Sequence, residues 1–424
     1  MTLGCCDTSV MAEHNWAENY TYLAATIHRP STIDEARQLV INASRIRVLG
    51  TRHSFNDIAD SAELLSLDNL PAPVTFDRSA GTVSCSAGMR YGDLADLLRA
   101  ERVALHNLAS LPHISIGGAI ATATHGSGVR NGNLATAVAA LEMITSNGEL
   151  LSVSRGDTDF DGMVVGLGAL GVVTRVTLDV QPVYDMRQDV FESLAWDTLF
   201  EHFDEIVESG YSVSLFTTWG DYVEEVWIKS RLDQDLAVPD GDLFGAVRAT
   251  VDVHPIRSVS PEHCTAQLGV PGAWSDRLPH FRMEFTPSSG EEIQSEFFVA
   301  RHDAVAALRA VRELHADIAS TLQVSEVRTV AGDTLWMSPQ YGNDMVALHF
   351  TWIRDPDAVV RAVALIEAAL APFAAIPHWG KVFTMAAATI ASRCKRLGDF
   401  RVLAERLDPR GAFRNDWFER VLGR

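Results

Sequence analysis

Several features that mark large classes of protein are missing from this sequence. It contains no apolar run of membrane-spanning length, and residues 1–15 have neither the basic start nor the apolar stretch of a signal peptide. No HExxH or other metal-ligand spacing occurs, so we expect no metal site. These absences favour a cytoplasmic protein with no membrane partner, in which residues 1–10 form a loose tail and Met11 is an alternative start.

Cysteine and positive charge are both scarce. The cysteines lie at scattered positions without CxxC spacing, which is typical of reduced thiols and not of a disulfide framework. Against 35 Lys and Arg stand 55 Asp and Glu, a formal net charge of −20. Such a chain repels phosphates, which argues against nucleic acid or an anionic membrane as a partner. The charge favours neutral small molecules or a buried, locally basic site. The five cysteines are Cys5, Cys6, Cys85, Cys264 and Cys394.

The length and the order of patterns indicate more than one domain. A chain of 424 residues is long for one core. The middle of the chain has helical patterns at 195–210, 300–320 and 356–373, and aromatic-rich strand patterns at 211–219, 225–230 and 345–353. These predict an antiparallel sheet with helices over one face, an α+β arrangement. The first part alternates shorter elements: a helix at 34–44, strands at 45–50 and 82–88, a helix at 90–101 and a hairpin at 137–154 with a type I′ turn at Asn147-Gly148.

The usual nucleotide-binding fingerprints are absent, but three stretches of small residues take their place. Neither GxGxxG nor GxxxxGK[ST] occurs. Instead "GTRHSF" (50–55), "NLASLPHISIGGAIATATHGSG" (107–128) and "GLGALGVV" (166–173) are rich in Gly, Ala, Ser and Thr. Small residues let backbone N–H groups approach a phosphate closely. Each stretch alone is typical of a close-packed loop, and all three together favour a dinucleotide site.

Two strands carry polar side chains at alternate positions. In "SEVRTV" Glu326 and Arg328 share one face, and their apolar neighbours favour a strand that is partly buried. A Glu-x-Arg pair on a strand is otherwise a surface ion pair of little energetic value. In "ALHFTW" His349 shares a face with Thr351, and a lone histidine there is more often a satisfied core residue. Lys381 follows in "HWGK", where burial and a neighbouring cation would lower its pKa and suit it to proton removal or alkoxide stabilisation.

Together with "PHWGKVF" and "LDPRGAFRND", these stretches make the chain resemble the vanillyl-alcohol-oxidase class of FAD-linked oxidases. Within that class it is most similar to the alditol (xylitol) oxidases, from about Asn15 to Val421. The resemblance implies an α+β, two-domain FAD-linked oxidase fold with an FAD-binding domain formed from both chain ends. An α+β substrate domain with an antiparallel sheet is inserted between them. The implied boundaries are 1–182, 183–377 and 378–424.

The resemblance also implies roles for particular residues toward FAD. His53 stands where alditol oxidases bond covalently to the 8α carbon of the flavin. Such sequences often have glycine before that histidine, whereas here Arg52 would either clash with the pyrophosphate or add a positive charge to it. Non-covalent FAD remains the alternative. Ala109 would leave room for dioxygen. Expected FAD contacts are Val48, Leu49, Gly50, Thr51, Arg52, His53, Ser54, Ser110, Ser115, Gly118, Thr122, Ala123, Thr124, His125, Val172 and His378.

The activity that the resemblance implies is oxidation of the terminal alcohol of an alditol such as xylitol or sorbitol to the aldose. Electrons would pass to O2, which gives H2O2, and the protein would act as a monomer. Glycine before the lysine of "HWGK" favours alditols over the alternative, a sugar-1,4-lactone oxidase. A non-catalytic flavin-binding protein is a second alternative. The implied substrate contacts are Ser110, Glu326, Arg328, Thr351 and Lys381, and the implied catalytic residues are Arg328, Lys381, Glu326 and His349.

Overall fold

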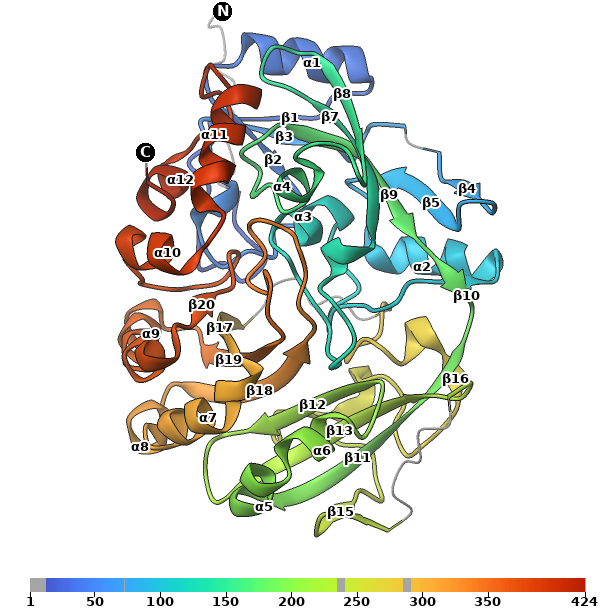
Figure 1. Cartoon of the computed structure of the whole chain (residues 1–424), viewed down its shortest axis with the longest axis vertical. Coiled ribbons are helices and arrows are strands. Elements are labelled where there is room, and N and C mark those ends of the chain that lie inside the picture. Colours follow the sequence, from blue (N-terminus) through green and yellow to red (C-terminus); the bar gives the residue numbers. More distant parts are fainter. Residues whose placement is uncertain (1–12, 72, 235–240, 285–290, 424) are drawn as a thin grey trace, which may run out of the picture.

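A computed structural model of the chain describes residues 13–71, 73–234, 241–284 and 291–423, so the tail 1–10, Met11, Cys5 and Cys6 lie outside it. Figure 1 shows an upper part that holds the first strands and the last helices, and a lower part that holds most of the largest sheet. Along the described residues, the chain therefore passes through the upper part, then the lower part, and then the upper part again.

The upper part is built on two sheets. Three short strands pair in parallel in the order β1-β3-β2, and five strands pair antiparallel in the order β4-β5-β9-β7-β8. Strands β6 and β10 form a two-stranded ladder. The bounds are β1 Thr26–His28, β2 Ile46–Leu49, β3 Glu63–Ser66, β4 Thr75–Asp77, β5 Thr82–Ser86, β6 Val103–Ala104, β7 Val138–Ile144, β8 Leu150–Ser154, β9 Val172–Asp179, β10 Gln181–Pro182, α1 Ile33–Asn42, α2 Tyr91–Ala100, α3 Ile116–Ala121 and α4 Phe160–Val164.

The predicted hairpin at 137–154 is present as β7 and β8, but its turn is not type I′. A type I′ turn needs positive φ at both central residues. Here only Gly148 has positive φ, +76°, and Asn147 does not. The N–H of Gly148 donates to the carbonyl of Thr145 at 2.9 Å. The loop is therefore one residue longer than predicted, with glycine in the left-handed position.

The lower part is one antiparallel sheet in the order β14-β15-β11-β13-β12-β18-β19-β17-β20, with β16 paired to β11. This confirms the antiparallel sheet that the sequence predicts. The bounds are β11 Asp185–Ala195, β12 Ser212–Thr217, β13 Tyr222–Arg231, β14 Asp242–Leu243, β15 Ala246–Arg248, β16 Gly272–Ala273, β17 Glu292–Ala300, β18 Leu322–Val330, β19 Met345–Ile353 and β20 Ile376–Pro377.

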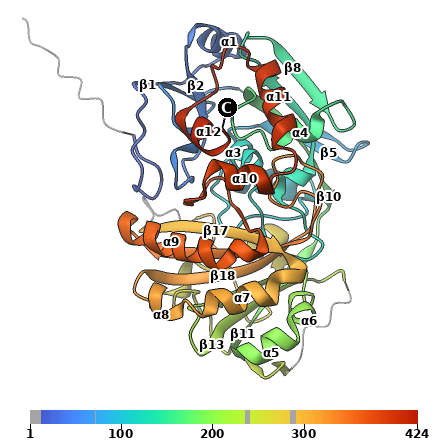
Figure 2. The same cartoon turned by 60° about the vertical axis from the view of Figure 1, so that its left-hand side comes forward.

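Helices cover one face of this sheet (Figure 2). The core between them combines alternate strand residues such as Val327, Leu348 and Phe297 with helix residues such as Leu308 and Val363. Because side chains on a strand alternate between faces, the intervening residues point to the opposite face. The bounds of these helices are α5 Trp196–Glu201, α6 Phe203–Val207, α7 Ala304–Arg312, α8 His315–Ile318 and α9 Pro356–Leu370.

The sequence predicts three long helices in the middle of the chain, and for two of them the predicted length is wrong. The pattern at 195–210 is broken at His202, whose φ of −117° and ψ of 27° are not helical, so α5 and α6 are separate. The pattern at 300–320 likewise divides into α7 and α8. The third is confirmed as α9, where Asp355 caps the first turn by accepting from the N–H of Ala358.

The last helices pack into the core of the upper part. They are α10 Ala387–Arg393, α11 Leu397–Leu407 and α12 Asp416–Val421. Phe400 and Trp417 belong to the same hydrophobic core as Ile46 of β2. The buried guanidinium of Arg47 donates to the carbonyls of Phe413 and Leu167 at 2.7 and 2.6 Å. The two ends of the chain therefore share one core.

The described part of the chain contains no helix long and apolar enough to cross a membrane. It also contains no group of three or more His, Cys, Asp or Glu side chains that would hold a metal ion. The thiols of Cys85, Cys264 and Cys394 are free.

Candidate active site

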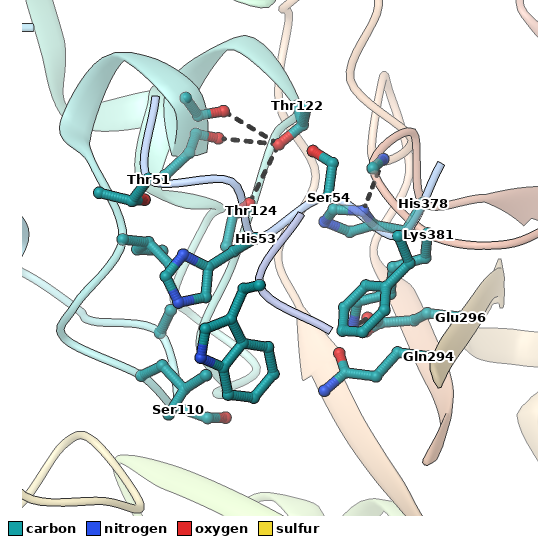
Figure 3. Close-up of a pocket in the computed structure, with 18 of the residues that line it drawn as sticks. Thr51, His53, Ser54, Ser110, Thr122, Thr124, Gln294, Glu296, His378 and Lys381 are labelled. Carbon is teal, nitrogen blue, oxygen red and sulfur yellow. Dashed lines mark hydrogen bonds and ion pairs between the residues drawn. The ribbon is translucent and has the colours of Figure 1, made fainter. Parts of the chain in front are cut away.

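A cavity of about 470 Å³ lies between the upper part and the uncovered face of the large sheet. An adjoining cavity of about 100 Å³ shares Gly50, Ser115 and Gly118 with it. Figure 3 shows His53 on one side of the larger cavity and Glu296 and Lys381 on the other. The two cavities together form a long site that runs from the glycine-rich loops to the sheet.

The larger cavity gathers most of the residues that the sequence predicts. Ala123 and Val172 are exceptions: they are fully buried and do not line either cavity. Val172 lies in β9, opposite Ile144. The predicted residues that line the larger cavity are Val48, Leu49, Gly50, Thr51, Arg52, His53, Ser54, Ala109, Ser110, Ser115, Gly118, Thr122, Thr124, His125, Glu326, Arg328, His349, Thr351, His378 and Lys381.

His53 presents a neutral imidazole to the cavity. Its ring stacks on Trp16 at a centroid distance of 5.3 Å. Burial, followed by the nearby His113, lowers the pKa of His53 to about 4. Its Nδ1 is buried and has no hydrogen-bond partner among the described residues. A neutral imidazole nitrogen without a partner carries a free lone pair or N–H, which a ligand in the cavity would satisfy.

Arg52 has a backbone conformation that favours glycine. Its φ is +64°, in the left-handed region that side chains disfavour. The carbonyl of Arg52 accepts from the N–H of Trp16 at 2.8 Å, and its guanidinium forms an ion pair with Glu13. The hydrogen bond from Trp16 thus holds Arg52 in this strained conformation. The ion pair with Glu13 binds the guanidinium to a residue that lies outside the glycine-rich loops.

The first two glycine-rich loops come together around Ser115. A Cβ atom on Gly50 or Gly118 would lie only 2.6 or 2.8 Å from the Ser115 hydroxyl oxygen. A side chain at either position would therefore displace the Ser115 hydroxyl. The backbone N–H of Ser115 donates to Thr51 Oγ1 at 3.0 Å, and Thr122 and Thr124 add two hydroxyls at 3.1 Å from each other. Backbone N–H groups that no side chain covers, together with several hydroxyls, form the set of donors that a pyrophosphate needs.

On the sheet side, three polar residues form one row across three strands. The register pairs Glu326 of β18 with His349 of β19, and His349 with Glu296 of β17. Thr351 and Gln294 form the neighbouring row. All five residues line the cavity. The polar face of the sheet therefore carries a compact array of acceptors and donors.

Glu296 is the centre of this array. Its carboxylate forms ion pairs with Lys381 and with Arg328, the latter at 3.3 Å, and lies 2.8 Å from His125 Nε2. Burial acts to raise the pKa of Glu296, but Lys381, His125 and Arg328 hold it well below its usual range. Glu296 is thus a buried, ionised carboxylate that organises the cations of the site.

Lys381 also contacts His349. Its Nζ lies 2.7 Å from His349 Nδ1, and His349 Nε2 lies 3.1 Å from Thr351 Oγ1. Burial first, and Arg328 in addition, lower the pKa of Lys381 even though Glu296 opposes the shift. Burial and then Lys381 lower the pKa of His349 to about 4, so the imidazole is neutral. His349 is therefore a member of the polar array and not an isolated core histidine.

The Glu326–Arg328 pair is buried and is not a surface ion pair. The two side chains are 4% and 6% exposed, and Glu326 Oε1 lies 3.4 Å from Arg328 Nε. Burial raises the pKa of Glu326, but Arg328 and His280 outweigh it and lower that pKa far below the usual range. Arg328 Nη1 lies 3.4 Å from Ser110 Oγ. This pair therefore offers a fixed acceptor and a fixed donor to a ligand with hydroxyl groups.

The residues of the cavity that the sequence-based prediction misses include Trp16, His280, Gln294 and Glu296. It also misses Lys229, which contacts His280 from outside the cavity lining. A lone Glu in the apolar run "SEFFV" was a usable signal for Glu296, because a strand that is buried on both faces rarely carries a carboxylate. Lys229 in "VWIKS" gave a similar signal. Nothing local in the sequence indicated that Trp16 stacks on His53 or that His280 lies beside Glu326.

Comparison with known proteins agrees with this geometry. Residues 24–154 match the FAD binding domain family, and residues 288–421 match the D-arabinono-1,4-lactone oxidase family. An alditol oxidase from a Streptomyces species is 47% identical over 413 residues, covering 96% of this chain and 98% of that protein. The chain belongs to the alditol oxidase family of FAD-dependent oxidases.

More distant relatives share the fold of this alditol oxidase family member. An L-gulono-1,4-lactone dehydrogenase from Mycobacterium tuberculosis is 30% identical, covering 96% of this chain and 98% of that protein. The crystal structure of cholesterol oxidase from B. sterolicum matches with a TM-score of 0.77 at 15% identity, covering 97% of this chain and 96% of that one. The α+β FAD-linked oxidase fold that the sequence predicts is thereby confirmed.

The residues of the two cavities fit FAD. The unpartnered Nδ1 of His53, the close approach of Gly50 and Gly118 to Ser115, and the threonine hydroxyls suit a long, flat ligand with a pyrophosphate. The residues that would hold it lie after β2 and around α3. This leaves the polar face of β17, β18 and β19 for a second ligand.

Proposed function

We propose that this alditol oxidase family member oxidises the terminal CH2OH of alditols such as xylitol and sorbitol. The overall reaction converts RCH2OH and O2 to RCHO and H2O2. The observation that carries the proposal is the row Glu326–His349–Glu296, with Arg328, Thr351 and Lys381 beside it, facing a cavity that also contains His53. A row of fixed donors and acceptors suits a substrate with successive hydroxyls.

Different residues of the chain bind the substrate and accept its proton. The chemistry that bound FAD supplies is acceptance of a hydride from the alcohol carbon and transfer of two electrons to dioxygen. Glu326, Arg328, Thr351 and Ser110 bind hydroxyls of the substrate and fix the position of its terminal carbon. Such placement matters more than any single contact, because the reacting carbon must lie at a defined place beside the cofactor.

Lys381 takes the proton from the reacting hydroxyl. Its two contacts in the site, to Glu296 and to His349 Nδ1, are both acceptors and use two N–H bonds of a neutral amine. The remaining lone pair on Nζ is then available to the substrate hydroxyl. Once the proton is on Nζ, the adjacent carboxylate of Glu296 stabilises the ammonium. The lowered pKa of Lys381 makes the neutral amine accessible.

Ala109 sets the access of dioxygen. This residue is 8% exposed and lines the cavity beside Ser110. A small side chain there leaves space that a larger one would fill, which favours an oxidase over a dehydrogenase. The domain division that we propose with this function is an FAD-binding domain at 1–182, a substrate domain at 183–377 and a C-terminal segment at 378–424.

A spectroscopic experiment tests this function directly. Anaerobic addition of xylitol to the purified protein should bleach the flavin absorbance, and readmitted oxygen should restore it with formation of H2O2. A yellow protein that does not bleach with any polyol or lactone would support the non-catalytic flavin-binding alternative.

We further propose that FAD is covalently attached through His53. A neutral imidazole nitrogen is a competent nucleophile toward the activated methyl group of an oxidised flavin, and the low pKa of His53 keeps it neutral. The new C–N bond would replace a C–H bond of the methyl group and the N–H bond of the imidazole, and the two electrons and two protons released would reduce O2 to H2O2. After acid precipitation or denaturing electrophoresis, flavin should stay with the polypeptide, and His53→Ala should release it. His302→Ala, at a histidine whose side chain is 79% exposed, is the matched control and should retain flavin. Flavin recovered entirely in the supernatant of the unmodified protein would contradict covalent attachment.

A further inference from the structure

The chain contains only three lysines: one lines the cavity, and another lies buried beside His280. Lys395 is exposed, and Lys381 belongs to the proposed proton-transfer machinery. The third, Lys229 of β13, is 1% exposed. Lysine is rarely buried so completely unless every N–H of its ammonium has a partner. Hydrophobic packing alone therefore does not account for a lysine at this position.

Lys229 is surrounded by three acceptors. Its Nζ lies 2.6 Å from the carbonyl of Leu278, 3.0 Å from that of Pro279 and 3.0 Å from His280 Nδ1. A neutral amine has two N–H bonds, so only the ammonium form donates to all three. When it does so, His280 Nδ1 is an acceptor and the proton of the neutral imidazole must lie on Nε2.

The other nitrogen of His280 meets the substrate-binding carboxylate. His280 Nε2 lies 2.8 Å from Glu326 Oε1, and Arg328 Nε lies 3.4 Å from the same oxygen. Burial, and then Lys229, lower the pKa of His280 to about 4, so the imidazole is neutral and donates a single proton. Neither contact uses Glu326 Oε2. The chain of contacts thus runs from Lys229 through His280 to one defined oxygen of Glu326.

We propose that Lys229 and His280 are positioning residues that fix Glu326 as the acceptor for a non-reacting hydroxyl of the substrate. The proposal deepens the proposed alditol oxidation and rests on it. The Lys229 ammonium sets the tautomer of His280, and His280 holds Glu326 Oε1 so that Oε2 faces the substrate. Without the ammonium, the imidazole can turn a lone pair toward the carboxylate, and the two repel each other.

A matched pair of substitutions at His280 tests the donor. His280→Gln keeps an N–H donor near the position of Nε2, whereas His280→Leu keeps comparable volume and has none. Loss of a hydrogen bond to a charged group should raise the KM for xylitol by about tenfold or more in His280→Leu. His280→Gln should stay within about threefold of the unmodified enzyme, and the limiting rate of flavin reduction should change little in both. Equal effects of the two variants, or a loss in rate without a change in KM, would overturn the proposal.

A double-mutant cycle tests whether Lys229 acts through His280. Lys229→Met should raise the KM for xylitol by about tenfold, since it removes the cation that orients the imidazole. In the His280→Gln background, the same substitution should have almost no further effect, because the amide donor does not depend on Lys229. An equal effect in both backgrounds would show that Lys229 stabilises the fold and does not position Glu326. If Lys229→Met does not fold, the comparison of His280→Gln with His280→Leu and the measurement of the His280 tautomer by nuclear magnetic resonance still test the proposal.

The pH dependence of substrate binding adds a readout that packing alone would not produce. Burial lowers the pKa of Lys229 to about 7, so its ammonium is present below that pH and is lost above it. The KM for xylitol should therefore rise as the pH increases through about 7. The groups that face Lys229 are His280, Glu326, Cys264, Arg328 and Arg277, and the pKa values of the first three lie far from 7.

One residue on the same strand requires a control for this profile. Glu225 has a pKa raised by burial to about 7 and accepts from the indole N–H of Trp227. Glu225→Gln should keep the rise in KM, whereas His280→Gln should abolish it. A rise that disappears in Glu225→Gln and persists in His280→Gln would overturn the assignment to Lys229.

Nuclear magnetic resonance reads the tautomer without any substrate. In protein labelled with [15N]histidine at pH 6, the signal pair that is missing in His280→Gln should show a protonated Nε2 and an unprotonated Nδ1. The opposite tautomer would overturn the proposal. If the enzyme oxidises no alditol, the proposed function fails, while this measurement still decides whether Lys229 sets the state of His280.

Discussion

Xylitol and sorbitol should be oxidised with a kcat/KM about 10⁴ times that of butanol. A site that binds successive hydroxyls through Glu326, Arg328 and Thr351 leaves these buried groups unpaired when the hydroxyls are missing. Each unpaired group retains its full desolvation cost, which is why rejection of a deoxygenated analogue is steep. Glycerol fills only part of the row and should fall between xylitol and butanol.

The measurement is oxygen uptake across the panel, with peroxide determined as product. Aldonolactones should be weak substrates, because a closed ring cannot extend a chain of hydroxyls along the face of β17, β18 and β19. The match of residues 288–421 to the D-arabinono-1,4-lactone oxidase family makes 1,4-lactones the informative comparison. A 1,4-lactone that outpaces every alditol would show that the sugar-1,4-lactone oxidase alternative is right.

Replacing Lys381 or Arg328 by alanine should slow flavin reduction by about a hundredfold or more, the scale of losing a base or a charge stabiliser. Lys381→Ala removes the acceptor for the hydroxyl proton, and Arg328→Ala removes the cation that contacts Glu296 and Glu326. Because the neutral amine of Lys381 is the active form, the reduction rate of the unmodified enzyme should fall as the pH drops below the pKa of Lys381. That limb of the pH profile should be absent in Lys381→Ala.

Stopped-flow reduction of the flavin by xylitol under anaerobic conditions measures this effect without interference from the oxygen step. Lys395→Ala and Arg361→Ala are the matched controls, since both side chains are exposed and lie away from the cavity. The FAD content should remain near one per chain in all four variants. Near-normal reduction rates in both Lys381→Ala and Arg328→Ala would show that the active site is misplaced.

Local patterns in the sequence determined the elements and one side of the site. Alternation along "SEVRTV" put Glu326 and Arg328 on one face, and the structure shows both side chains buried 3.4 Å apart on β18. The glycine-rich stretches indicated a nucleotide site, and Gly50 of the first stretch approaches Ser115 of the second. These predictions succeeded because side-chain periodicity and the conformational freedom of glycine are properties of a short segment.

The tertiary structure alone decided which of these residues are neighbours. Register between β18, β19 and β17 places His349 between Glu326 and Glu296, and a slip of one residue would turn each side chain to the opposite face. His280 reaches Glu326 from a loop and is contacted in turn by Lys229 of β13, and no local pattern indicates either contact. Register and long-range contact depend on how whole faces pack against one another. The sequence therefore determined the chemical groups of this oxidase, and the packing of its sheet determined how they are combined.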